Sequence, residues 1–240
     1  MSMKITTSGG FLIGRLCDKS LSDRDRSALL ALANEETADE LLCLMAEAEA
    51  LADPKVIFGV CAVKACDSAT IQINGTAVDS PLVWEKLKDK KRCFPYVATC
   101  GVELEAWSER YRDDLLTEFW ADEIKKLYLQ RIGVRLFGYL RERYRSAEHL
   151  PALNPGSLKD WPLGGQRELF EILGGRELVE NQIGVVYTES FLMLPSKSIS
   201  GIAFESDAFY ENCQYCPLTN CPNRRAAAVC NAGDGAAIDG

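Results

Sequence analysis

The sequence predicts an α+β fold in which an antiparallel sheet is flanked by helices, one of them long. Two observations lead to this prediction. Several segments carry apolar residues at helical spacing behind helix-capping side chains. Other segments are short, rich in β-branched and aromatic residues, and bounded by turn signals, which is typical of paired strands.

Residues 1–54 are expected to form an N-terminal helical region, because two capping signals precede apolar runs. Ser22 stands three residues before Asp25, and Thr37 stands three residues before Glu40, which is the spacing of a capping box. The helices expected from these signals are Asp23–Asn34 and Ala38–Ala52.

Residues 55–210 are expected to form the α+β core. An Asn74-Gly75 pair closes one strand and indicates a hairpin turn. Gly101 opens the longest helical segment, whose polar face is dense in charged residues, as in a helix packed on one side. The expected strands are Lys55–Val63, Thr70–Ile73, Cys93–Cys100, Gly184–Leu194 and Ser198–Phe204. The expected helices are Leu82–Lys88, Gly101 to about Arg145, and Gln166–Leu173.

The segment His149–Gly165 is rich in prolines and turn-forming residues, so we expect a loop there. It should be ordered, because its large apolar side chains need burial. These side chains are Leu150, Leu153, Leu158, Trp161 and Leu163.

Charge and hydropathy narrow the choice of partners. The chain has 35 acidic against 27 basic residues, a formal charge of −8, and no sustained Lys/Arg stripe, which argues against nucleic acid as a partner. No window of about 18 apolar residues is present, so no membrane association is expected. The segment Met1–Gly10 lacks the pattern of a secretory signal, and we therefore expect a cytoplasmic location.

Missing motifs exclude several enzyme classes. The one histidine, His149, cannot supply a His-based triad, a facial iron triad or an HExxH zinc site. No GxGxxG follows a strand and no GxxxxGK[ST] is present, so neither a dinucleotide nor a nucleoside triphosphate site is indicated.

Residues 211–240 form a C-terminal cysteine cluster and tail. Cys213 and Cys216 are separated by two residues, Cys221 follows, and Cys230 is the candidate for a fourth metal ligand. Two thiolates at this spacing can coordinate one metal ion. Cys221 and Cys230 would complete a tetrahedral zinc site or help to hold an iron–sulfur cluster. The spacing leaves both metals open, and also unligated thiols in a turn. The remaining cysteines are expected to be core residues: Cys17, Cys43, Cys61, Cys66, Cys93 and Cys100.

The segment Thr188–Gly201, TESFLMLPSKSISG, resembles the TESFxMxPxxSxSG run of the activation (reactivation) domain of cobalamin-dependent methionine synthase. Upstream, Asn154-Pro155-Gly156 is similar to that family's arginine-x-x-P-G-Y loop, and Thr99-Cys100-Gly101 precedes an acid-rich helix. The resemblance covers about residues 55–204 and implies the activation-domain fold, with an antiparallel sheet flanked by a long helix.

The resemblance also implies an S-adenosylmethionine site. It would involve Asp122 or Glu123 on the long helix together with the matching segments: Asn154, Pro155, Gly156, Ser157, Ser196, Lys197, Ser198 and Tyr210. Ala152 and Ser157 stand where the family has an Arg and a Tyr, so S-adenosylmethionine binding is expected to be weak or lost. The residues alone leave a plain turn at Pro155-Gly156-Ser157 as an equal alternative.

The function implied is that of a stand-alone reactivation partner for a corrinoid protein or cobalamin-dependent methyltransferase. The family domain presents the methyl of S-adenosylmethionine to inactive cob(II)alamin while a flavodoxin-type donor supplies one electron. Cobalamin is expected on the partner, because this chain lacks the DxHxxG loop of corrinoid-binding modules. The cysteine cluster would then replace the flavodoxin. The alternative is a non-enzymatic binding or assembly module with a structural zinc site.

Overall fold

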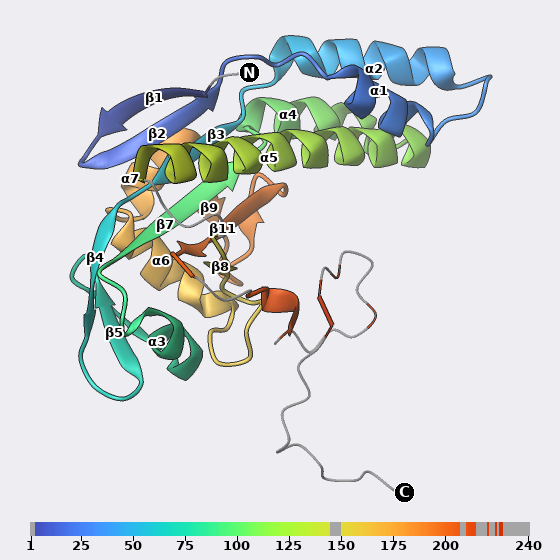
Figure 1. Ribbon diagram of the computed structural model, residues 1–240. Coiled ribbons are helices and arrows are strands. Elements are labelled where there is room, and N and C mark those ends of the chain that lie inside the picture. Colours follow the sequence, from blue (N-terminus) through green and yellow to red (C-terminus); the bar gives the residue numbers. More distant parts are fainter. Residues whose placement is uncertain are drawn as a thin grey trace, which may run out of the picture.

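The computed structural model describes residues 3–144, 150–206, 210–214, 220, 224, 226 and 227. It is an α+β structure whose main sheet is antiparallel throughout and is flanked by helices, including the 30-residue helix α5 (Leu115–Tyr144). Figure 1 shows α5 lying across one face of the sheet, with α6 (Gln166–Ile172) and α7 (Arg176–Ile183) beyond the other. The predicted fold class is confirmed.

The strand at the centre of the sheet is β7 (Arg92–Thr99). β3 (Lys55–Phe58) pairs with one side of β7, and β11 (Ser198–Ala203) pairs with the other. The expected single strand Lys55–Val63 is divided at Gly59-Val60, and its second part, β4 (Cys61–Ala65), also pairs with β7. The three predicted sheet strands therefore do meet in one antiparallel sheet.

The N-terminal region contains a strand hairpin that the sequence patterns did not predict. β1 (Met3–Ser8) and β2 (Phe11–Leu16) are joined by Gly9 and Gly10, whose φ angles are +57° and +85°. Positive φ at both central residues is what a type I′ hairpin needs, and Gly-Gly supplies it without steric cost. β2 pairs with β3, so a region expected to be only helical also extends the sheet.

The remaining strands are short. They include the predicted hairpin across Asn74-Gly75, and the expected strand Gly184–Leu194 proves to be two strands joined by a turn. Their bounds are β5 (Thr70–Ile73), β6 (Thr76–Asp79), β8 (Ala152–Leu153), β9 (Val186–Tyr187) and β10 (Met193–Leu194).

The helix caps follow the sequence in one case and not in the other. Ser22 caps α1 (Asp23–Leu30) with the complete capping box. Thr37 makes no capping bond to α2 (Ala38–Leu51), because its hydroxyl donates to the side chain of Asn34, at 2.8 Å. The other helices are α3 (Pro81–Leu87), α4 (Val102–Ser108), the 3-10 helices Glu109–Tyr111 and Leu163–Gly165, α5, α6 and α7.

The expected helix from Gly101 to Arg145 is interrupted, and the interruption helps to form the candidate site. α4 and the 3-10 helix Glu109–Tyr111 end before Asp113-Asp114, and α5 begins at Leu115. The carboxylate of Asp114 accepts from Leu116 N at 3.1 Å and from the Thr117 hydroxyl at 2.8 Å. An acid that satisfies backbone donors in this way starts a new helix.

Apolar clusters on both faces hold the sheet between its helices. α5 turns fully buried side chains toward one face at intervals of four residues, and each such side chain contributes about 1.5 to 3 kcal/mol. They are Trp120, Ile124, Tyr128, Ile132 and Leu136. The loop before α6 is ordered as expected: Leu150, Leu153, Leu158 and Trp161 are buried, and Leu163 is half-buried.

The cysteines outside the C-terminal cluster divide into two groups. Cys61, Cys93 and Cys100 are buried core residues, and burial raises the pKa of the Cys61 thiol to about 11 and that of Cys100 to about 12. The same prediction is wrong for Cys17, Cys43 and Cys66, which are exposed. Cys43 lies off the buried stripe of α2, and the other two follow the ends of strands.

Within the described part of the chain, none of the helices has the length and apolar character needed to span a bilayer.

Candidate functional site

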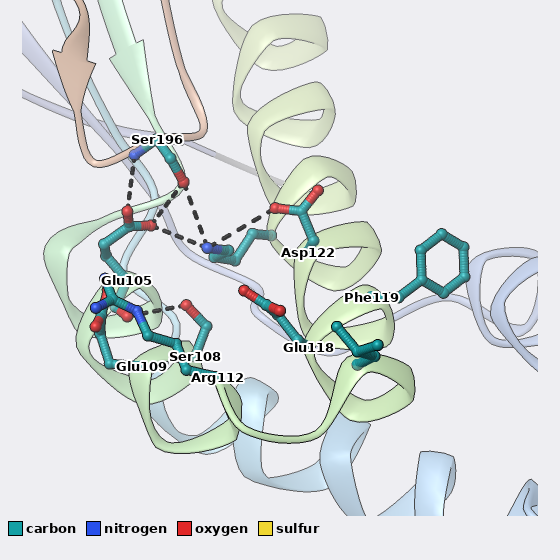
Figure 2. Close-up of a pocket in the computed structure, with 10 residues that line it drawn as sticks. Glu105, Ser108, Glu109, Arg112, Glu118, Phe119, Asp122 and Ser196 are labelled. Carbon is teal, nitrogen blue, oxygen red and sulfur yellow. Dashed lines mark hydrogen bonds and ion pairs between the residues drawn. The ribbon is translucent and has the colours of Figure 1, made fainter.

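A cavity of about 410 Å³ opens between α4, the N-terminal half of α5 and the segment before β11. This is within the usual size range of small-molecule sites. Figure 2 shows polar side chains entering it from α4 and α5, with Ser196 above them. Its lining consists of Glu105, Ser108, Glu109, Arg112, Leu115, Glu118, Phe119, Asp122, Lys125 and Ser196.

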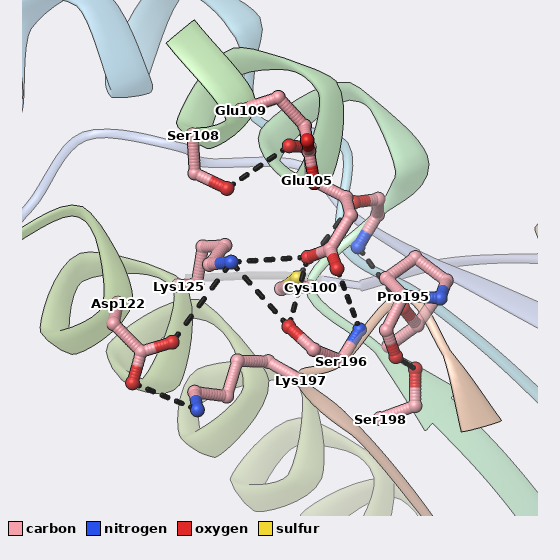
Figure 3. A network of polar contacts seen from close by, with 12 residues as sticks. Cys100, Glu105, Ser108, Glu109, Asp122, Lys125, Pro195, Ser196, Lys197 and Ser198 are labelled. Carbon is pink, nitrogen blue, oxygen red and sulfur yellow. Dashed lines mark hydrogen bonds and ion pairs between the residues drawn. The ribbon is translucent and has the colours of Figure 1, made fainter. Parts of the chain in front are cut away.

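Lys125 is the centre of the polar network at this cavity (Figure 3). Its side chain is only 8% exposed, and its ammonium donates to Glu105 Oε2 at 3.0 Å and to Ser196 Oγ at 3.4 Å. Glu105 also accepts from the Ser196 backbone N–H at 3.1 Å. These contacts tie α4, α5 and the segment before β11 together, because each of the three residues comes from a different element.

The network keeps Glu105 ionised. Burial by itself would raise the pKa of this carboxyl, but the bonds from Ser196 and the ammonium of Lys125 outweigh burial and hold the pKa below its usual range. The buried lysine therefore faces a carboxylate and not a neutral acid.

The cavity as a whole is negative. Four carboxylates line it, from Glu105, Glu109, Glu118 and Asp122, against two cations. One cation, Lys125, already bonds Glu105, and the other, Arg112, bonds Glu109 at 2.6 Å. Lys197, which is not part of the lining, pairs with Asp122 at 2.8 Å, and the acids still outnumber the cations when it is included. An environment of this sign attracts a positively charged ligand group.

One wall of the cavity is apolar. Leu115 is 83% exposed and Phe119 is 47% exposed, and both lie on the first turns of α5. An exposed aromatic ring beside polar groups offers a surface on which a planar heterocycle can stack.

The predicted loop Asn154–Ser157 forms a tight turn. Ser157 N donates to the carbonyl of Asn154 at 3.1 Å, and Gly156 has φ +82° after Pro155. A positive φ at the third residue, following proline, identifies a type II turn and explains the glycine. The plain-turn alternative for Pro155-Gly156-Ser157 therefore explains the backbone conformation here without a bound ligand.

The side chain of Asn154 is fully engaged inside the protein. Its amide nitrogen donates to the Ser200 carbonyl at 2.5 Å and to the Tyr96 hydroxyl at 3.3 Å. Its amide oxygen accepts from the side chain of Asn212. Tyr210 is buried and donates to Asn212 Oδ1 at 2.9 Å, so it belongs to the same set of contacts.

The predicted site residues thus fall into two groups. Ser196 lines the cavity, Lys197 pairs with Asp122 at 2.8 Å, and Ser198 donates to the Pro195 carbonyl at 2.8 Å. The side chain of Asn154 instead donates to the Ser200 carbonyl, further along the chain. Three residues lie between Ser196 and Ser200, so the Cα atoms of these two residues are at most about 14 Å apart.

Sequence reasoning missed several residues of the cavity, although two of them carry a signal. Lys125 occupies a core-facing position on α5, between Ile124 and Tyr128 in the apolar stripe, where a lysine needs a buried partner. That partner, Glu105, belongs to the acid-rich helix after Gly101. Of the two acids considered on α5, Asp122 lines the cavity, whereas Glu123 pairs with Lys126 at 2.9 Å.

Of the cysteine cluster, Cys213 is described, whereas Cys216, Cys221 and Cys230 lie outside the described residues. Cys213 is half-buried, and its carbonyl accepts from the guanidinium of Arg224. In the described part of the chain, no group of three or more His, Cys, Asp or Glu side chains is arranged to hold a metal ion. The predicted metal site stays a prediction.

Together these features define an α+β domain with an acidic cavity where its long helix begins. No protein-family model matches the sequence, and no curated protein matches it. Among solved structures, the chain is similar to the crystal structure of the MetH reactivation domain bound to AdoHcy, with a TM-score of 0.59 and 15% sequence identity. The similarity covers 88% of this chain and 83% of that one. At this identity the likeness shows a shared fold, which is the fold that the sequence resemblance implies.

Proposed function

We propose that this protein binds S-adenosylmethionine, weakly, and serves as a reactivation partner for a cobalamin- or corrinoid-dependent methyltransferase. The observation that carries the proposal is the acidic cavity beside Ser196, within a fold similar to the MetH reactivation domain bound to AdoHcy. In the reaction served, a flavodoxin-type donor or the cysteine cluster supplies one electron to the cobalt of an inactive corrinoid on another polypeptide, the cobalt takes the methyl group of S-adenosylmethionine, and S-adenosylhomocysteine leaves.

The residues present suit the charge and shape of this ligand. S-Adenosylmethionine carries a sulfonium and an ammonium, and Asp122, Glu118 and Glu109 line the cavity as carboxylates. Its adenine is planar, and Phe119 offers an exposed ring. The polar loop at Asn154 bonds Ser200, whose Cα lies at most about 14 Å from that of Ser196 at the cavity, and we propose that an elongated ligand approaches both groups.

Weak binding is part of the proposal. Ala152 lies in β8 and Ser157 closes the type II turn, and neither supplies the cation or the aromatic ring expected there from the family loop. A charge-assisted bond and an aromatic contact contribute on the order of 1 to 3 kcal/mol each, so their absence weakens binding by about two decades.

Calorimetry with matched ligands tests the assignment of the cavity. We expect Asp122→Asn to weaken S-adenosylmethionine binding about tenfold, because it removes a carboxylate and leaves Lys197 without its partner. S-Adenosylhomocysteine lacks the sulfonium charge, so its affinity should change much less. Glu123→Gln is the control, since Glu123 pairs with Lys126 outside the cavity. Equal losses for both ligands, or for both variants, would contradict the assignment.

The same measurements test the loop. Ala152→Arg combined with Ser157→Tyr should tighten S-adenosylmethionine binding at least tenfold if these positions match the family loop. A submicromolar dissociation constant for the unmodified protein would overturn the proposal that binding is weak.

A further inference from the structure

The loop at Asn154 and the cysteine-bearing segment are joined by side chains that lie far apart in the sequence. Asn212 donates to Asn154 Oδ1, and the Tyr210 hydroxyl donates to Asn212 Oδ1 at 2.9 Å. On its other side Asn154 donates to the Ser200 carbonyl and to the hydroxyl of Tyr96. We call Tyr96, Asn154, Tyr210 and Asn212 the amide clasp.

The side chains of the clasp are buried, so their hydrogen bonds contribute to local stability. Tyr96, Tyr210 and Asn212 are 3%, 5% and 8% exposed. A buried amide that loses its hydrogen-bond partner is still removed from water, and this destabilises the closed structure. Breaking one bond of the clasp therefore favours local opening. Gly201 shows how close the packing is, because a Cβ there would lie 2.5 Å from Asn154 Nδ2.

The clasp ends one residue before the first cysteine of the cluster. Asn212 is followed directly by Cys213, and the Cys213 carbonyl accepts from Arg224. Adjacent Cα atoms are about 3.8 Å apart and two hydrogen-bonded Asn side chains span about 8 Å, so Cys213 lies within about 12 Å of Asn154. The backbone at Cys213 is therefore held close to the loop.

We propose that Asn212 and Asn154 are positioning residues that couple the loop Asn154–Ser157 to the Cys213 segment. Loosening the loop Asn154–Ser157 should loosen the backbone at Cys213, and the reverse should also hold, because both are held by the same hydrogen bonds. For its purpose the inference rests on the proposed function: the clasp holds the backbone at Cys213 close to the loop that we propose approaches the ligand.

Hydrogen exchange tests the coupling in one direction. Asn212→Ala should speed exchange of the Gly156 and Ser157 amides about three- to tenfold, although these residues are more than 50 positions away in sequence. Amides of the β1–β2 hairpin should not change, which shows that the variant is folded. Unchanged exchange at Gly156 and Ser157 would overturn the proposal.

Thiol labelling tests the other direction. Asn154→Ala should raise the rate at which iodoacetamide labels Cys213 about three- to tenfold, read by peptide mass spectrometry against the exposed Cys43 as an internal reference. The exposed Lys159, two residues after Ser157, gives the control Lys159→Ala. An equal effect of the two variants on Cys213 would contradict the clasp. Neither experiment contains S-adenosylmethionine or a corrinoid, so the outcome is separate from that of the proposed function.

Discussion

At the scale of single residues, the cavity depends on one ion pair between a nearly buried lysine and an acid. Lys125 is 8% exposed, and its Nζ lies 3.0 Å from Glu105 Oε2 and 3.9 Å from Asp122 Oδ1. A buried ammonium that loses its main partner is costly, whereas the pair itself adds little beyond cancelling desolvation. We therefore expect a substitution of Glu105 to lower the stability of the fold mainly because Lys125 stays buried without its partner carboxylate.

Glu105→Gln should lower the free energy of unfolding by about 2 kcal/mol at pH 7, because Lys125 then lacks its carboxylate. The folded-state pKa of Glu105 is lowered, so its stabilising contribution is fully present above the unfolded-state pKa and is lost as pH falls through the folded value. The difference between the variant and the unmodified protein should thus shrink below about pH 4. Urea denaturation at several pH values measures it.

Glu109→Gln serves as the control for this experiment, since Glu109 makes an exposed pair with Arg112, with side chains 45% and 67% exposed. An exposed pair contributes on the order of 0.5 kcal/mol or less. A loss as large as that of Glu105→Gln, or a loss for Glu105→Gln that does not vary with pH, would argue against the buried pair as the cause.

At the scale of elements, the cavity exists because the chain turns sharply between β7 and α4 and again between α4 and α5. The first turn is at Gly101, where φ is +103°, and a Cβ there would lie 2.7 Å from the Asp53 carbonyl. The sequence predicts Gly101 as a helix start, but it does not show that another backbone segment lies against it.

Gly101→Ala should destabilise the fold by about 3 kcal/mol, from backbone strain at positive φ together with the clash against Asp53. Gly133→Ala in α5 is the matched control, because a Cβ there meets open space and alanine has the higher helix propensity. We expect it to be neutral or to stabilise by up to about 1 kcal/mol. Thermal unfolding of both variants decides the matter, and similar changes in the two would show that the turn is less constrained than the geometry indicates.

At the scale of the whole molecule, a folded α+β body is followed by the cysteine-bearing segment. The body provides the cavity and the loop, and the amide clasp joins the start of the cysteine segment to it. If the cysteines bind a metal, the centre belongs to the same unit as the proposed ligand site.

Protein produced without oxygen should contain iron or zinc bound by Cys213, Cys216 and Cys221, with Cys230 as the candidate for a fourth ligand. Metal analysis after anaerobic reconstitution measures this, and a brown colour would indicate an iron–sulfur cluster. The double substitution Cys213→Ser with Cys216→Ser should abolish binding, whereas Cys43→Ser with Cys66→Ser, at exposed thiols elsewhere, should not. Equal metal content in both double variants would contradict metal binding by the C-terminal cysteines.

The sequence by itself determined the fold class and most elements, because these depend on local periodicity and turn chemistry. The capping box at Ser22, the hairpin at Asn74-Gly75 and the existence of the strands β3, β7 and β11 follow from patterns within a few residues. The β1–β2 hairpin carried a readable Gly-Gly signal, yet β1 lacks the apolar alternation by which strands are recognised.

Only the tertiary structure decided which side chains share a site. Glu105, Lys125 and Ser196 come together because α4, α5 and the segment before β11 pack at one corner, and no local pattern fixes that packing. The structure likewise shows that Asn154 bonds Asn212 and Tyr96 within the protein. Hydrogen-bond partners more than 50 residues apart depend on how the elements fold together, and the sequence around each residue does not record them.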